Sequence, residues 1–316
     1  MVDKNLNIII RFSANNKIGT GHFFHSLNLF KEFKKRKCNV IMLLKNCDYF
    51  IEEQLNELKI KYLIEDNKFD FSSLKKPDSK NIFINDILDT SAEEIIKQKN
   101  EGFKVVNIED RGSGSNYADL IINALYDKST KNKNEFNGHD FTILRDSFAK
   151  EKHNINYEEN EKIIISFGGT DPSKLTEKSF LSLEKSKLPF LIIEPPFRET
   201  NLEDERVLKN VNNIETIFSK AKIGITSMGR TLLEFLYLGI PILSIAQNAR
   251  EAEHSMNQSN LIKYLGVAEE LEDEKFFHTV KEFYENQEHL TFLNKKISNS
   301  IDGLGLNRVC DLIINI

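Results

Sequence analysis

The sequence contains no tryptophan, only three cysteines and only six prolines among its 316 residues. The cysteines (Cys38, Cys47 and Cys310) have no CxxC spacing, which argues against a zinc ribbon and against a disulfide framework. We therefore expect buried thiols and a cytoplasmic protein. No apolar run is long enough to cross a bilayer, so we expect no stable membrane insertion.

A strong charge of either sign is also missing. The net charge is −5, and lysines and acids are interspersed along the chain. No global basic field is available to attract nucleic acid, and the 23 phenylalanines are scattered rather than interleaved with basic patches. We expect a globular monomer with a phenylalanine-rich core and no nucleic-acid partner.

What the sequence does have is a regular alternation of short β-rich runs with helical patterns, which predicts α/β architecture with parallel sheets. A helix is predicted after Gly21, with Phe23, Leu27 and Phe30 as its apolar stripe and His22 off that stripe. Another helix is predicted over Ala92–Asn100. The β-rich runs fall at residues 8–10, 40–44, 82–84, 105–107, 120–122, 162–166, 190–193, 223–225 and 241–245.

The polar stretch from Ala149 to Glu161 loses this periodicity and predicts the connection between two domains. The N-terminal domain is then expected over residues 1–150 and the C-terminal domain over residues 160–316. Each half begins with a strand, a glycine turn and a helix. We predict two Rossmann-like, doubly wound domains that face one another across a cleft.

The first glycine turn is Gly19-Thr20-Gly21-His22. Glycines before a helix N-terminus suit phosphate binding, and a histidine that opens the helix can take or give a proton near neutral pH. Because open α/β sheets place their chemistry at the carboxyl ends of strands, His22 is a candidate general base. His22 and His25 lie one turn apart and form a possible metal-binding pair, but no acid motif accompanies them, so we favour the general base.

The second glycine turn is Gly168-Gly169-Thr170-Asp171. Paired glycines let a ligand approach the backbone closely, and Thr170 adds a polar group near a helix start. The alternative is that Asp171 or Ser173 caps the following helix, and capping and ligand binding are compatible.

In a third segment a strand delivers Ser227 and Gly229 to a helix N-terminus, which suits a diphosphate. Glu234 lies one turn into that helix among apolar residues, where a carboxylate without a partner costs several kcal/mol at the order-of-magnitude level. The hydroxyls of a nucleotide ribose are suitable partners. The alternative is an i,i+4 pair with Arg230, worth about 0.3–0.5 kcal/mol.

Together these segments resemble the PseG/SpsG group of nucleotide-sugar enzymes, which are relatives of MurG with the GT-B fold. PseG is a UDP-amino-sugar hydrolase of pseudaminic acid biosynthesis, and SpsG names a wider set of surface-polysaccharide proteins. The resemblance rests on the three segments above, on Asn257-Gln258-Ser259-Asn260, and on Arg11, Leu144-Arg145 and Asp302-Gly303-Leu304-Gly305 as supporting matches.

The resemblance implies a role for each matching residue. His22 matches the histidine that activates water for attack on the anomeric carbon, and Glu234 matches the acid on the uridine ribose. Ser227 and Gly229 match the diphosphate-binding helix start. The loop near the diphosphate and sugar corresponds to Gly168, Gly169 and Thr170, and further substrate contacts are implied for Arg11, Gly19, Gly21 and Asn257.

One position departs from the family pattern, since His25 stands where the family often has an arginine. A permanent donor is thereby replaced by a titratable one, which leaves the sugar open. We predict hydrolysis of a UDP-amino-sugar, with a glycosyltransferase that uses the same donor and a non-catalytic nucleotide-sugar-binding partner as alternatives. The chain has no Asp-x-Asp run of the kind that holds Mg²⁺, so we expect neither a metal nor another cofactor.

Overall fold

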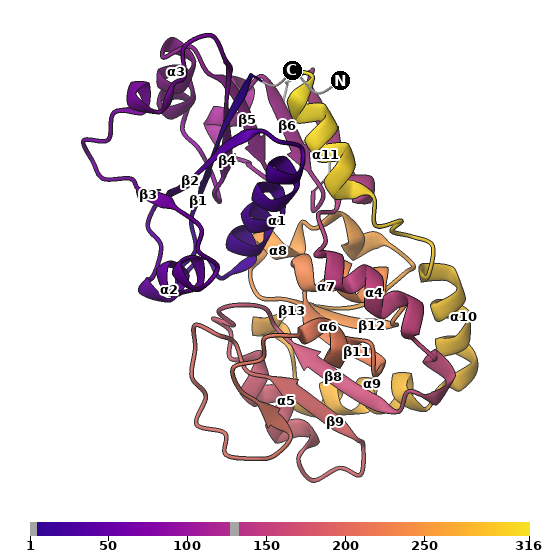
Figure 1. Ribbon diagram of the computed structural model, residues 1–316. Helices are drawn as coiled ribbons and strands as arrows, with labels where there is room; N and C mark the ends of the chain where they lie inside the picture. Colours follow the sequence, from indigo (N-terminus) through magenta and orange to yellow (C-terminus); the bar gives the residue numbers. More distant parts are fainter. Residues whose placement is uncertain (1–4, 127–132) are drawn as a thin grey trace. The chain divides into compact units, whose positions relative to one another are not determined.

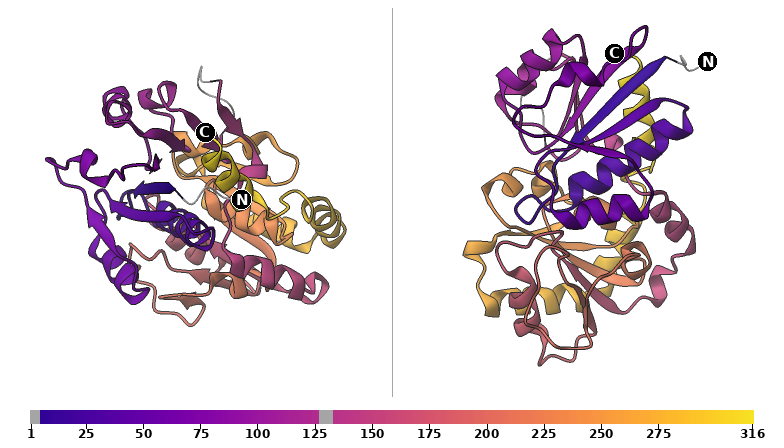
Figure 2. Two further views of the ribbon diagram at one scale, coloured as in Figure 1. Left: turned by 45° about the horizontal axis from the view of Figure 1, so that its top comes forward. Right: turned by 60° about the vertical axis from the view of Figure 1, so that its left-hand side comes forward.

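The computed structural model describes residues 5–126 and 133–316. The chain divides into two compact units, each built on one parallel sheet (Figures 1 and 2). Unit 1 comprises Met1–Leu144 and Leu304–Ile316, and unit 2 comprises Arg145–Gly303.

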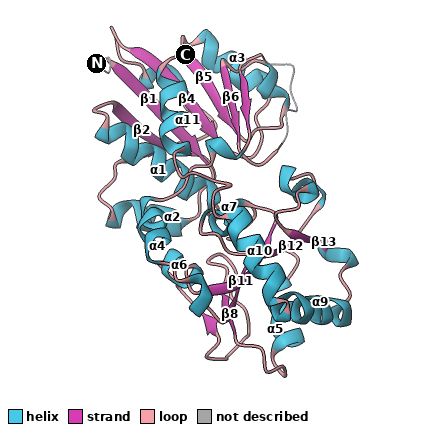
Figure 3. Cartoon of the chain, turned by 90° about the vertical axis from the view of Figure 1, so that its right-hand side faces the viewer, coloured by secondary structure: helices cyan, strands magenta, loops and turns pink. Residues whose placement is uncertain are grey.

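In unit 1 the described sheet has seven parallel strands in the order β3-β2-β1-β4-β5-β6-β7, and Figure 3 shows its central strands side by side. Helices α1 and α11 pack together on this sheet. The elements are β1 (Leu6–Phe12), α1 (Gly21–Lys35), β2 (Asn39–Leu44), α2 (Tyr49–Glu57), β3 (Tyr62–Ile64), η1 (Phe71–Leu74), β4 (Lys80–Asp86), α3 (Ala92–Asn100), β5 (Lys104–Ile108), η2 (Ser113–Asn116), β6 (Leu120–Asn123), β7 (Glu135–Asn137), η3 (His139–Phe141) and α11 (Gly305–Ile314).

Both faces of this sheet are buried, which explains the continuous apolar runs of its central strands. Successive side chains of a strand point to opposite faces. Ile9 and Phe83 accordingly pack with Ile95 of α3 on one face. On the other face, Phe12 of β1 packs against Phe23 of α1, with 6.0 Å between ring centroids.

The point where the strand order reverses lies between β1 and β4. After β1 the chain passes through α1 to β2 on one side, whereas β4 pairs with the other side of β1. Open α/β sheets bind ligands beyond the carboxyl ends of strands at such a point. The last residues of these two strands, Phe12 and Asp86, are direct neighbours in the register.

Unit 2 has a described sheet of six parallel strands in the order β10-β9-β8-β11-β12-β13, so its reversal point lies between β8 and β11. The core includes Ile163 and Ile165 of β8, Phe276 of α9 and Leu290 of α10. The elements are α4 (Asp146–Asn154), η4 (Tyr157–Glu159), β8 (Lys162–Ser166), α5 (Leu175–Leu183), β9 (Phe190–Ile193), β10 (Val207–Leu208), α6 (Ile214–Phe218), β11 (Ala221–Ser227), α7 (Arg230–Tyr237), β12 (Ile242–Ala246), α8 (Ala249–Ala252), η5 (Ser255–Gln258), β13 (Lys263–Val267), η6 (Ala268–Glu270), α9 (Asp273–Glu285) and α10 (Gln287–Ile297).

Every β-rich run of the sequence overlaps a strand, and the helix predicted over Ala92–Asn100 is α3. The strands that the sequence did not indicate (β3, β7, β10 and β13) are all edge strands. Most of their side chains remain partly or fully exposed, so they lack the apolar run by which a central strand is found.

The two units differ from the expected domains in two ways. The polar stretch after Ala149 was expected to be a connection, but its first part belongs to helix α4 of unit 2. Phe148 is buried in that helix and lies 6.3 Å from Phe218 of α6, measured between ring centroids. The last helix, α11, belongs to unit 1 rather than to the C-terminal domain.

Contacts within unit 1 explain why α11 belongs there. Arg36, which follows α1, forms an ion pair with Asp311 of α11. At the far end of α11, the Ile314 carbonyl accepts a hydrogen bond of 2.9 Å from Lys80 of β4.

Among the helices that the structure describes, none combines the length and the apolar character that crossing a membrane requires.

Candidate functional site

At the reversal point of unit 1, two histidines and a serine of α1 converge on one carboxylate. His22 Nδ1 lies 2.7 Å from Asp86 Oδ1, and His25 Nδ1 lies 2.9 Å from Asp86 Oδ2. The Ser26 hydroxyl donates to Asp86 Oδ2 over 2.9 Å. Asp86 is completely buried, and the side chains of His22 and His25 are 9% and 4% exposed.

The local sequence explains this convergence. Gly19 has a φ of +88°, a left-handed conformation that favours glycine, and the turn it forms leads directly into α1. Residues at i, i+3 and i+4 share one helix face, so His22, His25 and Ser26 all point to the same side. That side meets the end of β4, where Asp86 is the last residue.

Electrostatics favour the ionised form of the Asp86 carboxylate. Burial would raise the pKa of Asp86, but the charges of His25 and His22 and their hydrogen bonds together hold that pKa well below its ordinary value. The carboxylate is therefore ionised at neutral pH and accepts a hydrogen bond from the Nδ1–H of each imidazole. In the neutral imidazole of His22 the lone pair then lies on Nε2, which is the atom that can take a proton.

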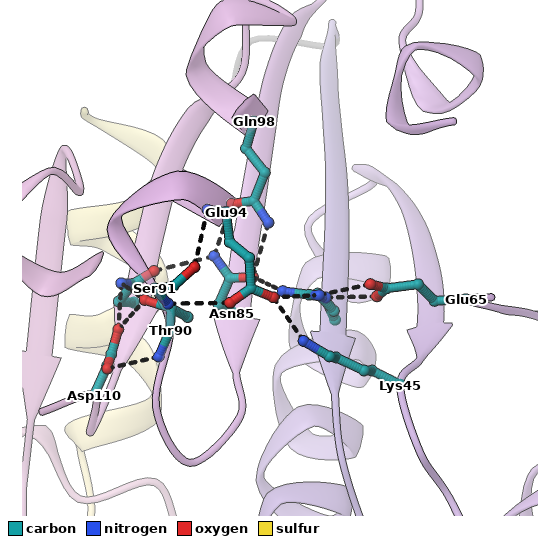
Figure 4. A network of polar contacts seen from close by, with 10 residues as sticks. Lys45, Glu65, Asn85, Thr90, Ser91, Glu94, Gln98 and Asp110 are labelled. Carbon is teal, nitrogen blue, oxygen red and sulfur yellow. Dashed lines mark hydrogen bonds and ion pairs between the residues drawn. The ribbon is translucent and has the colours of Figure 1, made fainter. Parts of the chain in front are cut away.

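A separate polar network fills the opposite face of the same strand ends (Figure 4). Arg11 donates to Glu65 over 2.6 Å, to Glu94 over 2.9 Å and to the Asn85 side chain over 3.2 Å. Lys45 also binds Glu94, over 2.6 Å, and the pKa of Glu94 falls to about 2 because these cationic donors outweigh its burial. The Arg11 guanidinium thus donates hydrogen bonds to three side chains of the protein.

The network continues across the sheet from Asn85. Its amide exchanges hydrogen bonds with Gln98 of α3 and donates to Asn107 of β5 over 3.0 Å. Asn107 in turn donates to Thr90 and to Asp110. Burial raises the pKa of Asp110, although Thr90 and backbone amides donate to its carboxylate.

In unit 2, the glycine turn after β8 combines an open backbone with a capped helix. Gly168 has a φ of +80°, and a Cβ added there would meet no atom within 4 Å. Asp171 is fully buried and accepts hydrogen bonds from the amides of Leu175 (2.9 Å) and Thr176 (2.8 Å) at the start of α5. The capping role considered for Asp171 is therefore confirmed, and the space beside Gly168 is open.

Two side chains from the β12–α8 region support this turn and the start of α7. The amide of Gln247 donates to the Phe167 carbonyl over 3.0 Å, and the Gln247 carbonyl accepts from the Ser173 hydroxyl over 2.9 Å. Glu251 accepts from the Gln247 backbone amide over 2.9 Å and from the Met228 backbone. Burial raises the pKa of Glu251 to about 7 despite these bonds.

Helix α7 begins after Gly229, as the sequence predicted, and Ser227 is the last residue of β11. Glu234 lies one turn into α7, and its side chain is 19% exposed. Burial raises the pKa of Glu234 to about 7, while Arg145 lowers it, Glu215 raises it and Arg230 lowers it. The ion pair that the structure gives for this carboxylate is with Arg145, over 3.9 Å.

Comparison with known proteins finds two relatives in sequence and several solved structures of the same fold. No protein-family model matches the chain. The spore coat polysaccharide biosynthesis protein SpsG of Bacillus subtilis is 22% identical over 320 residues, covering 93% of this chain and 94% of SpsG. Protein MJ1062 of Methanocaldococcus jannaschii is 28% identical over 280 residues, covering 78% of this chain but 57% of MJ1062, so this chain spans little more than half of that relative.

Two solved structures show the fold. MurG of Acinetobacter baumannii has a TM-score of 0.66 and 14% identity, with 98% of this chain and 100% of that chain covered. Alr3699/HepE of Anabaena, solved with UDP and glucose, has a TM-score of 0.60 and 13% identity, with 98% and 99% covered. The chain has the GT-B fold of these structures, and its sequence is similar to that of SpsG.

Within this fold, the expected site residues form separate groups. Unit 1 places Gly19, Gly21 and His22 at its reversal point and Arg11 on the opposite face of the sheet. Unit 2 brings the turn after β8 and the start of α7 to adjacent strands. Asn257 lies in η5, where its side-chain amide donates to the Ala252 carbonyl. His254 is buried, and its Nδ1 accepts from the Met256 amide over 3.0 Å.

Sequence reasoning missed the residue that ties the His22 cluster together. Asp86 stands 64 residues from His22, and no local pattern links the two. The available signal was a carboxylate at the end of the strand predicted over residues 82–84, since that strand end belongs to the edge where ligands bind. In the part of the chain that the structure describes, no group of three or more His, Cys, Asp or Glu side chains is arranged to hold a metal ion.

Proposed function

We propose that this chain is a nucleotide-sugar enzyme of surface-polysaccharide biosynthesis, and that it hydrolyses a UDP-amino-sugar to UDP and free sugar. The observation that carries the proposal is the buried Asp86 carboxylate on Nδ1 of His22 at the reversal point of the first sheet. The name of SpsG, the UDP and glucose in the HepE structure and the shared fold support the substrate class.

The nucleotide is assigned to unit 2. There Gly168, Gly169 and Thr170 follow β8, while Ser227 and Gly229 lead from β11 into α7, and these two strands flank the reversal point. The eight residues of α7 direct the partial positive charge of their N-terminus at an anion, which suits a diphosphate. The Glu234 carboxylate would accept hydrogen bonds from the ribose hydroxyls.

The reaction uses His22 as the general base. His22 Nε2 takes a proton from water while the water oxygen bonds to the anomeric carbon, and the bond from that carbon to the diphosphate oxygen breaks with its electron pair on UDP. Asp86 stabilises the imidazolium that forms, because an adjacent carboxylate favours the protonated ring. The charge that develops on UDP is met by backbone amides at the start of α7.

A glycosyltransferase is the second candidate, favoured by the fold shared with MurG and with the glycotransferase of kitacinnamycin, which has a TM-score of 0.61 and 11% identity. The same base would then deprotonate an acceptor hydroxyl instead of water. A binding protein without turnover is the third. Incubation with UDP-sugars, first without and then with candidate acceptors, separates the three by release of free sugar, by turnover only with acceptor, or by binding alone.

The variant that tests the base is His22→Asn, with His278→Asn as a matched control, since His278 lies on α9 with its side chain 63% exposed. We expect His22→Asn to lower kcat by about 10²–10⁴-fold and to leave UDP affinity unchanged, because a positioned base contributes that much and UDP is bound by unit 2. The control should match the wild type in both. Wild-type kcat in His22→Asn would show that His22 is structural.

A further inference from the structure

The Asp86 cluster contains three titratable side chains, whereas a general base and the carboxylate that orients it are only two. His25 holds the second oxygen of Asp86 over 2.9 Å, is 5% exposed and has no part in the proposed reaction. The two imidazoles therefore share a single buried carboxylate, one on each oxygen, and Ser26 adds a neutral donor.

We propose that His25 is a positioning residue that sets the proton affinity of His22 through the Asp86 carboxylate they share. The base of this chain would then titrate as part of a His–Asp–His unit rather than as a single imidazole. The inference rests on the proposed function only where His22 is taken as the catalytic base, and the coupling itself is a property of the free protein.

The physical reason is the charge balance of the unit. With both imidazoles neutral the unit carries the single negative charge of Asp86, one proton makes it neutral, and a second proton adds an uncompensated positive charge. Because the unit is buried, that second proton is strongly disfavoured, so the two histidines compete for the first one. Whenever His25 carries that proton, the charge of Asp86 is already compensated, so His22 stays neutral and its proton affinity is lower than when His25 is neutral.

Other charged groups on the elements packed against α1 are bound elsewhere. Arg11 of β1 faces the opposite side of the sheet, where it binds Glu65 and Glu94. Lys80 of β4 donates to the Ile314 carbonyl, and Asp311 of α11 pairs with Arg36 beyond the far end of α1. Arg308 of α11 donates to the Asp140 carbonyl over 3.1 Å. The described strand β2 carries no titratable side chain. His25 is a titratable residue that the geometry couples to His22 through the carboxylate they share.

Two substitutions of His25 should shift the titration midpoint of His22 in opposite directions. In His25→Asn the side-chain amide can still donate to Asp86 but never takes a proton, so His22 receives the whole attraction of the carboxylate. Its titration midpoint should rise. In His25→Arg a permanent cation compensates Asp86, so the midpoint should fall. A charge within about 4–6 Å shifts a titration by about 1–3 pH units, so we expect the two variants to differ by that amount with the wild type between them.

The midpoint is measured by NMR titration of the histidine ring protons in the full chain, with the His22 signal assigned by its loss in His22→Asn. Coupling also predicts two inflections for His22 in the wild type and one in His25→Asn. Circular dichroism and UDP binding check that each variant is folded. If His25→Arg does not fold, the wild type and His25→Asn alone decide the question through the midpoint and the number of inflections.

Equal His22 midpoints in the wild type and His25→Asn, with one inflection in each, would overturn the inference and leave His25 a packing residue. The acid limb of the pH profile of kcat/KM is recorded for the same proteins. An acid limb that moves with the NMR midpoint supports both the coupling and the base. A midpoint that moves while the acid limb stays fixed supports the coupling and refutes His22 as the base, so the two failures are distinguishable.

Discussion

Substituting Asp86 by asparagine removes one charge from the interior of unit 1 while keeping the shape of the side chain. Asp86 is fully buried, and its carboxylate accepts hydrogen bonds from His22, His25 and Ser26. The amide that replaces it can still exchange hydrogen bonds with these neighbours if one imidazole changes its tautomer and the hydroxyl turns. What is lost is the charge on the acceptor.

The size of the effect follows from the number of bonds. A hydrogen bond to a charged group contributes about 1.5–3 kcal/mol and a neutral one about 0.5–1.5, a difference of about 1 kcal/mol per bond. With three bonds, Asp86→Asn should lower the free energy of unfolding of unit 1 by about 3 kcal/mol at pH 7. A neutral imidazole in the wrong tautomer also loses its Nε2 lone pair, so turnover should fall together with stability.

The pH dependence has a definite sign. The pKa of Asp86 lies well below its ordinary value in the folded chain, so near pH 4 the unfolded chain binds a proton that the folded chain does not. The stability from Asp86 is therefore complete above about pH 5 and is lost as the pH falls below about 4, by up to about 1.4 kcal/mol per pH unit. The difference in free energy of unfolding between the wild type and Asp86→Asn should become smaller over the same pH range.

Urea unfolding followed by circular dichroism measures this difference in free energy of unfolding. Hydrogen exchange of peptides from α1 and β4 shows whether the loss of stability lies in unit 1. Asp140→Asn serves as the control, because Asp140 is an exposed aspartate of the same unit and its change should stay within about 0.5 kcal/mol. If Asp86→Asn and Asp140→Asn unfold at the same urea concentration, the buried carboxylate does not hold α1 to the sheet and the reasoning is refuted.

Two further predictions concern unit 2. Glu234→Ala should weaken UDP binding about 10–100-fold in calorimetry, since a hydrogen bond to a charged group is worth about 1.5–3 kcal/mol. Burial raises the pKa of Glu234 to about 7, so wild-type affinity should fall as the pH drops through 7 and that of the variant should not. Unchanged affinity would mean that the carboxylate serves Arg145 instead. Activity should survive excess EDTA, because glycine amides and the start of α7 can meet a diphosphate without a cation; loss that Mg²⁺ restores would contradict this.

The central strands could be predicted from the sequence because burial on both faces imposes an apolar run. Ile8, Ile164 and Leu243 belong to such runs and are fully buried. An edge strand such as Tyr62–Ile64 has no such requirement, and its exposed Leu63 and Ile64 give no alternation to detect. Helix α4 was missed for a related reason: it is polar apart from Phe148, whose contact with Phe218 forms only in the folded unit.

The candidate site could be predicted from the sequence only in part. A glycine turn after a strand is a local signal, and it located His22 and the start of α7. The partner of His22 depends on the pairing of β1 with β4, which no local pattern records. The alternation of side chains along β1 could, however, have predicted the face of the sheet on which Arg11 lies. Its neighbour Phe12 packs on α1, so Arg11 must point to the other face of the sheet.

The end of β4 is held from both faces, and Arg11 is one of the residues that hold it. Asn85 is fixed on one face by Arg11, Gln98 and Asn107, while the next residue, Asp86, binds α1 on the other. A strand end clamped in this way cannot shift without breaking hydrogen bonds on both sides, so the carboxylate that orients His22 is fixed before any substrate binds. The buried polar network of Figure 4 therefore acts on the proposed base through the backbone of one strand.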